Sequence, residues 1–145
     1  MGKADFRCVF FVLGGDCDSG SIYLWTLKGK WIRKLEGHSH HVLALAVHND
    51  LIISGSRDET IKVWTMEGEC VKTLEGHSGW VNALAIHNDL IISGSGDKTI
   101  KIWTMGGECV KTLEGHSYSV RALAVHNDLI ISGSDDDTIQ MWKSG

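Results

Sequence analysis

Apolar residues fall along the chain in short runs that are separated by polar turns. Residues 42–47 are apolar at every position, as expected of a strand covered on both faces. Asn49-Asp50 follows, and both residues tolerate the positive φ that a two-residue hairpin requires. No window shows helical periodicity over two turns, so the pattern predicts an all-β unit. Its four expected strands cover 42–47, 51–56, 60–65 and 70–74.

This unit recurs with a period of 39 residues. By direct count, 31 of the 39 residues in 35–73 return in 74–112, and a third copy begins at residue 113. A period of this length indicates a solenoid or a propeller. We expect one domain over residues 1–145, with units at about 1–34 (degenerate), 35–73, 74–112 and 113–145 (truncated).

The two end units are incomplete in sequence. Aligning Trp25 with Trp64 leaves residues 6–13 to supply either one long strand or a second strand with a frayed first. The turn 14–20 is one residue longer than its counterpart, so Asp18 would need a bulge to reach the place of Asp58. Only three residues follow Trp142, so the last unit lacks a fourth strand. We expect three, four, four and three strands, 14 in all.

Three marks at fixed offsets resemble the WD-repeat family of β-propellers. They are the Gly37-His38 pair, the Ser54-Gly55-Ser56-x-Asp58 turn and the strand Ile61-Lys62-Val63-Trp64. The resemblance is close over 35–142 and loose over 10–34. The Asp that usually follows the Trp is Thr65, Thr104 or Lys143 here, at a position that is usually exposed. The resemblance implies an all-β fold of about four WD-repeat propeller blades, two of them incomplete.

The resemblance also implies a buried hydrogen-bonded network in each blade. It joins the His before the first strand, a Ser or Thr in the second strand, the turn Asp and the Trp. Such closed networks satisfy buried polar groups and stiffen a blade. A His, a Ser and an Asp also suit a hydrolase, but their recurrence favours a structural brace, so we expect no enzymatic activity. The network residues are His38, Ser56, Asp58, Trp64, His77, Ser95, Asp97, Trp103, His116, Ser134, Asp136 and Trp142.

The units differ from one another mainly at one end. In an up-and-down blade, the fourth-to-first and second-to-third connections share an end, whereas the invariant turn 48–50 lies at the other. Exposed turns tolerate drift, but drift rarely leaves one end untouched, and Trp, Tyr and Arg are frequent at interface hot spots. We therefore expect a rim that binds a protein or peptide. Its residues are His40, His41, Leu43, Arg57, Glu59, Gly79, Trp80, Asn82, Lys98, Tyr118, Ser119, Arg121, Asp135 and Asp137.

Composition narrows the class of protein. Hydrophobic residues make up 43% and charged residues 22%, an ordinary globular balance. The net charge of −4 gives no basic footprint for nucleic acid. No apolar run is long enough to cross a membrane, and the run 8–13 lacks a cleavage site. We expect a soluble, cytoplasmic protein.

Cysteine and histidine spacing argue against a metal or other cofactor. The four cysteines show no C-x-x-C spacing, so free buried thiols are expected. Three histidines lie within 38–41, but His38 belongs to the expected network and the next units offer one His each. His48, His87 and His126 could form a ring of imidazoles, although solvated hairpin residues are the expectation.

The chain has too few blades for a closed ring of this family. Such propellers usually close with about seven blades, in a range from about four to about eight. Two or more copies could share one ring, the chain could be part of a larger protein, or four blades could close alone, which the family's wedge angle disfavours. We expect a homodimer with one ring, eight blades being favoured over seven, and N-terminal residues lent across the junction. The alternative is a purely structural or engineered self-assembling protein with no external ligand.

Overall fold

The computed structural model describes residues 8–12 and 20–143. They form 14 strands in four antiparallel sheets. They include no helix, and so no helix that could span a membrane. The strands are β1 (Cys8–Val12), β2 (Gly20–Thr26), β3 (Trp31–His38), β4 (Val42–His48), β5 (Leu51–Ser56), β6 (Ile61–Thr65), β7 (Cys70–Leu74), β8 (Val81–His87), β9 (Leu90–Ser95), β10 (Ile100–Thr104), β11 (Cys109–Leu113), β12 (Val120–His126), β13 (Leu129–Ser134) and β14 (Ile139–Lys143).

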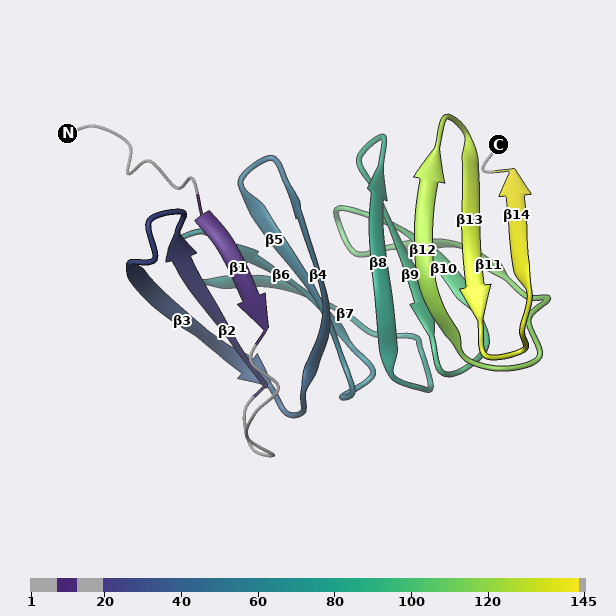
Figure 1. Ribbon diagram of the computed structural model, residues 1–145, viewed down its shortest axis with the longest axis horizontal. Helices are drawn as coiled ribbons and strands as arrows, with labels where there is room; N and C mark the ends of the chain where they lie inside the picture. The colour runs from purple at the N-terminus through teal and green to yellow at the C-terminus, as the bar shows by residue number, and fades with distance from the viewer. Residues whose placement is uncertain (1–7, 13–19, 144–145) are drawn as a thin grey trace.

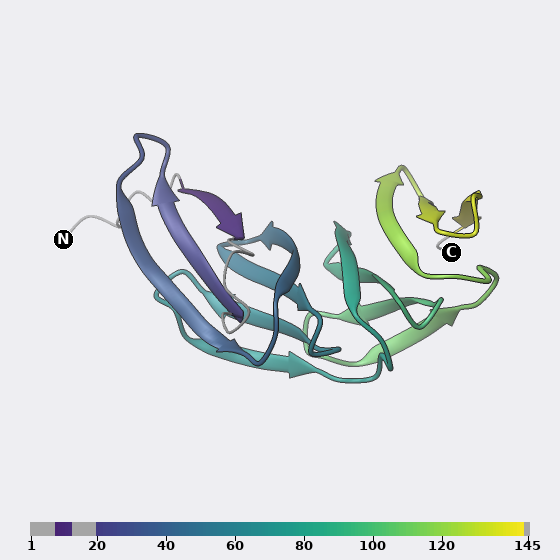
Figure 2. The ribbon, with the colours of Figure 1, turned by 60° about the horizontal axis from the view of Figure 1, so that its bottom comes forward.

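Each sheet is a meander of consecutive strands, with three, four, four and three strands in chain order. The sheets follow one another along an open arc, with the first sheet (β1–β3) and the last sheet (β12–β14) at its opposite ends (Figures 1 and 2). The prediction of four propeller blades, two of them incomplete, is confirmed. The two-residue hairpin is confirmed as well, because Asn49 and Asp50 have φ of 48° and 62° between β4 and β5.

The first sheet lacks the innermost strand of the others within the described residues. Cys8 pairs with Thr26 in β1–β2, just as Leu51 pairs with Thr65 in β5–β6. Strand β1 therefore takes the place of a second strand, one of the two arrangements that the sequence left open. Phe6, Leu13 and Asp18 lie outside the described residues.

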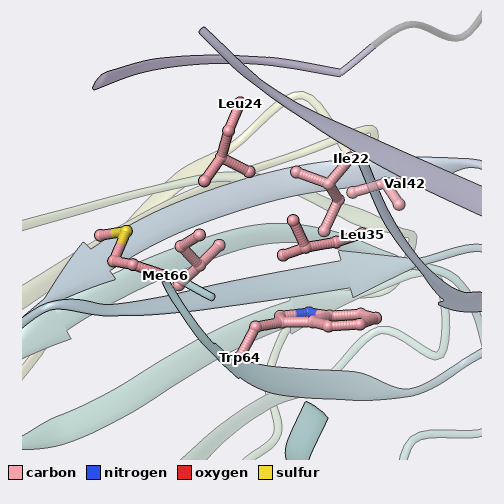
Figure 3. Packing of buried hydrophobic residues seen from close by; sticks show 7 residues of the cluster. Ile22, Leu24, Leu35, Val42, Trp64 and Met66 are labelled. Atoms are coloured by element: carbon pink, nitrogen blue, oxygen red, sulfur yellow. The ribbon is translucent and has the colours of Figure 1, made fainter. Parts of the chain in front are cut away.

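The core lies between successive sheets. Figure 3 shows Ile22, Leu24 and Leu35 of the first sheet facing side chains of the second, among them Trp64 and Met66. The next two junctions repeat this packing. The second-strand glycine permits it, because a Cβ on Gly55 would lie only 2.6 Å from Val81 Cγ1, and one on Gly94 equally close to Val120. In the second and third sheets, the glycine at this position thus leaves room for a valine of the following sheet.

The expectation that 42–47 is covered on both faces is wrong. Only Val42 of β4 is buried, and Val47 is 43% exposed. The first strands β4, β8 and β12 lie beside one another along the inner edge of the arc. That edge leaves one side of each first strand partly open, which accounts for the difference.

Both ends of the arc expose positions that are buried inside it. Ile139 and Met141 of β14 are 76% and 71% exposed, whereas Ile61 and Val63 at the same places in β6 are 0% and 1%. At the other end Leu27 is 70% exposed, against 6% for the equivalent Met66. Each end sheet therefore exposes an apolar face, whereas the corresponding faces of the interior sheets are covered by a neighbouring sheet.

Candidate functional site

Each of the last three sheets contains the same buried network. At the second sheet, His38 from the end of β3 has its Nδ1 2.7 Å from Asp58 Oδ2 and its Nε2 2.6 Å from Ser54 Oγ. Trp64 Nε1–H donates to the same Ser54 hydroxyl at 2.8 Å. Equivalent contacts join His77, Asp97, Ser93 and Trp103, and His116, Asp136, Ser132 and Trp142. A chain of contacts thus runs from the turn to the sheet interior.

The network holds its charge on the aspartates. Burial lowers the pKa of His38, although Asp58 on its own would raise it. Burial alone would raise the pKa of Asp58, but hydrogen bonds from Thr60 and His38 outweigh it and hold that pKa below its usual value. A neutral His38 then donates from Nδ1 to Asp58 and accepts from Ser54 at Nε2. These hydrogen bonds brace the turn, and the same contacts recur in the third and fourth sheets.

The network serine differs from the predicted one. Ser56, Ser95 and Ser134 were expected, but the hydroxyls that meet His and Trp belong to Ser54, Ser93 and Ser132. Ser56 Oγ instead donates to the carbonyl of His40 and accepts from Asp58 N–H. The register explains this, because Ile52 pairs with Trp64. Ser54 is two residues along β5 from that pair and Ser56 four, about 13 Å away at roughly 3.3 Å per residue.

The first sheet lacks this network among the described residues. Trp25, which takes the place of Trp64, has a buried Nε1–H with no hydrogen-bond partner there. The other sheets show why glycine precedes the network histidine, since a Cβ on Gly37 would lie 2.9 Å from the Trp64 ring. The first sheet is therefore the least braced of the four.

The variable residues gather at the rim formed by the second-to-third turns and the loops between sheets. The backbone N–H of Arg57 donates to the carbonyl of His41, and Gly96 donates to Trp80 in the same way. Across the junction of the second and third sheets, the Arg57 guanidinium lies 4.1 Å from the centre of the Trp80 ring. Arg121 Nε donates to Asp135 Oδ2 at 2.9 Å within the last sheet. Rim residues from successive sheets thus contact one another.

A cavity of about 380 Å³ opens on this rim, and residues of the second, third and fourth sheets and of the loops between them line it. We call it the rim hollow. Six of the predicted rim residues line it, together with Ser78 and Gly96, which the rim prediction did not include. Its lining residues are Glu59, Ser78, Gly79, Trp80, Asn82, Gly96, Ser119 and Arg121. Eight predicted rim residues lie outside it: His40, His41, Leu43, Arg57, Lys98, Tyr118, Asp135 and Asp137.

The opposite end carries contacts that the sequence did not indicate. His48 Nε2 lies 2.5 Å from Asp89 Oδ1, and His87 Nε2 lies 3.5 Å from Asp128 Oδ1. Each imidazole therefore links its hairpin to that of the following sheet, rather than being a solvated hairpin residue. His48 and Asp89 are 41 positions apart, which is the repeat length plus two. The sequence alone does not show that residues at this separation meet, because that depends on how successive sheets are placed beside each other.

The two cysteines whose side chains the structure describes are free but not buried as predicted. Cys70 and Cys109 are exposed, because they begin the outermost strands β7 and β11, where four of five residues face solvent. Cys17 and the side chain of Cys8 lie outside the described part of the chain. Within that part no cluster of His, Cys, Asp and Glu could hold a metal ion.

Known proteins share this sequence pattern and architecture. The family model described as "WD domain, G-beta repeat" matches residues 29–65, 68–104 and 107–143. Meiotic fizzy-related protein 1 of Schizosaccharomyces pombe (strain 972 / ATCC 24843) is 47% identical over 45 residues, which are 30% of this chain and 11% of that protein. The crystal structure of the computationally designed Ika4 protein matches with a TM-score of 0.85 at 32% identity, over 96% of this chain and 86% of that one.

Proposed function

The chain belongs to the WD40-repeat family, and from that premise we propose that it is a non-catalytic interaction scaffold whose copies assemble into one complete propeller. The exposure of Ile139 and Met141 at one end of the arc carries this proposal. Fully burying an apolar side chain of this size stabilises an association by about 1.5–3 kcal/mol. An arc that ends on such side chains gains stability when another sheet covers them.

The two end faces match each other as the faces of an interior junction do. Ile61 and Val63, the counterparts of Ile139 and Met141, pack against the following sheet. Met66, the counterpart of Leu27, packs against the preceding sheet. A second copy can therefore place its first sheet on the last sheet of this chain.

Two copies with four sheets each give a ring of eight blades, within the range that propellers adopt. Two equivalent junctions close such a ring, whereas an unclosed succession of copies would grow into filaments. The exposed thiols of Cys70 and Cys109 suit a reducing compartment, and we propose a cytoplasmic location.

The rim is the proposed site for a protein or peptide partner. Trp80, Tyr118 and Arg121 are 43%, 61% and about half exposed, and such residues often anchor interfaces. A purely structural role without an external ligand is the second candidate, which the similarity to a designed protein favours.

A pair of variants tests the junction. L27D and M141D each place a carboxylate in both junctions of a homodimer, so each should be monomeric by light scattering. In their equimolar mixture one junction of the mixed dimer carries neither substitution, so the mixture should associate more strongly than either variant alone. V71D, at a 47% exposed site on β7 away from both ends, is the control and should stay dimeric. An unchanged dimer for L27D would contradict the junction.

A further inference from the structure

Two neighbouring junctions differ in how the rim is filled. At the junction of the second and third sheets, Arg57 covers the Trp80 ring. The equivalent residues at the next junction are Gly96 and Ser119. A Cβ on Gly96 would meet the Trp80 backbone N at 3.5 Å and Ser119 Oγ at 3.6 Å, both ordinary contact distances, so the glycine leaves room here that a side chain could occupy. The rim hollow exists because both filling side chains are missing at this junction.

One residue in the wall of the rim hollow, Asn82, has a hydrogen-bond acceptor with no partner among the described residues. Asn82 Nδ2–H donates to the carbonyl of Val120 at 3.0 Å, which fixes the amide. Its Oδ1 is buried and accepts no hydrogen bond from the described residues. A buried acceptor left in this state costs free energy that a ligand donor would recover.

The charges at the rim hollow are unbalanced. Glu59 lines it, is exposed and forms no ion pair with any described residue. Arg121 also lines it, but its charge is compensated by Asp135 at 2.9 Å. Arg57 is also positively charged, but it lies on the Trp80 ring and is not among the lining residues, so the uncompensated charge of the lining itself is the Glu59 carboxylate.

We propose that the rim hollow binds an arginine side chain of a peptide partner. The guanidinium offers five N–H donors in a plane, which suits several acceptors at once, here Asn82 Oδ1 and the Glu59 carboxylate. Trp80 lines the hollow as well, and its ring already holds one guanidinium, that of Arg57, 4.1 Å from the ring centre. This inference rests on the proposed partner-binding role of the rim and names the chemistry that it recognises.

Capped tripeptides test the inference directly. Ac-Gly-Arg-Gly-NH2 is titrated to about 10 mM, with the signals of the Trp80 indole followed by NMR, and a dissociation constant on the order of 1 mM is expected for so small a ligand. The citrulline analogue keeps the shape and removes the charge. It should bind at least about tenfold more weakly, because hydrogen bonds to charged groups are the stronger ones.

Variants taken from the other units keep the fold intact. N82L installs the residue of the equivalent position 43, and E59K installs that of position 98. Each should weaken arginine binding about tenfold, whereas E67K, an equal charge change on an exposed turn elsewhere, should not. Thermal melts verify folding. Absence of binding, equal binding of citrulline, or wild-type binding by both N82L and E59K would overturn the inference. If W80A/Y118A/R121A still lost a protein partner in that case, the rim function would stand without it.

Discussion

The indole N–H of Trp103 donates to the hydroxyl of Ser93 at 2.8 Å. The same hydroxyl lies 2.7 Å from Nε2 of His77, so one buried oxygen joins the strand to the loop before the sheet. Ser93 is thereby the centre of the brace in the third sheet.

Replacing Ser93 by Ala should lower the free energy of unfolding by about 1–3 kcal/mol, because it leaves a buried indole N–H without an acceptor. S95A removes an acceptor for the Asp97 backbone N–H and should cost about 1 kcal/mol. Urea titrations followed by tryptophan fluorescence compare the two. A larger loss of stability for S95A than for S93A would show that Ser93 is not the centre of the brace.

The two larger members of the brace should matter at least as much. Trp103→Ala leaves a cavity and His77→Ala leaves buried groups unpaired, so each should cost about 2–4 kcal/mol. Exposed Ser78→Ala is the control. An unchanged urea midpoint for either variant would show that the network does not stabilise the sheet.

The repeat and its turn residues were sufficient to predict four meander sheets and the two-residue hairpin. The network serine was assigned wrongly, although counting the strand register from the turn would have identified it. The turn 57–59 pairs Gly55 with Ile61, and stepping back from there sets Ile52 against Trp64 and puts Ser54 nearest the indole. The rim hollow is different. It depends on which side chain of one sheet reaches across to the next, as Arg57 does to Trp80. The hydrophobic pattern of a single strand does not predict such contacts between sheets.

Acid should destabilise the protein through the brace. The pKa of Asp97 is lowered because hydrogen bonds from His77 and Thr99 outweigh the effect of burial, and Asp58 shows the same direction. A carboxyl with a lowered folded pKa contributes stability above its unfolded value of about 3.9 and loses that contribution as pH falls below it. The lowered pKa of His38 acts in the same direction below about 6.5.

Urea midpoints measured from pH 7 to pH 3 should therefore fall steadily, and D97N should show a shallower decline below about pH 4 than the wild type. A midpoint that is constant or rises on acidification would contradict the neutral histidine and the ionised aspartate.

The rim should be separable from stability. W80A/Y118A/R121A changes three side chains that are largely outside the core, so the melting temperature should move by less than about 4 °C. Binding of the arginine tripeptide should be lost, because Trp80 and Arg121 line the rim hollow. A drop of about 10 °C or more would mean that these side chains belong to the core.

The mass of the protein in solution tests the assembly most directly. Light scattering behind size exclusion, repeated over a hundredfold range of concentration, should give twice the 15.9 kDa of one chain, with dissociation only on dilution. It should give no larger species, because a closed ring leaves no free end face. A compact, cooperatively melting particle of 15.9 kDa at high concentration would contradict the shared propeller.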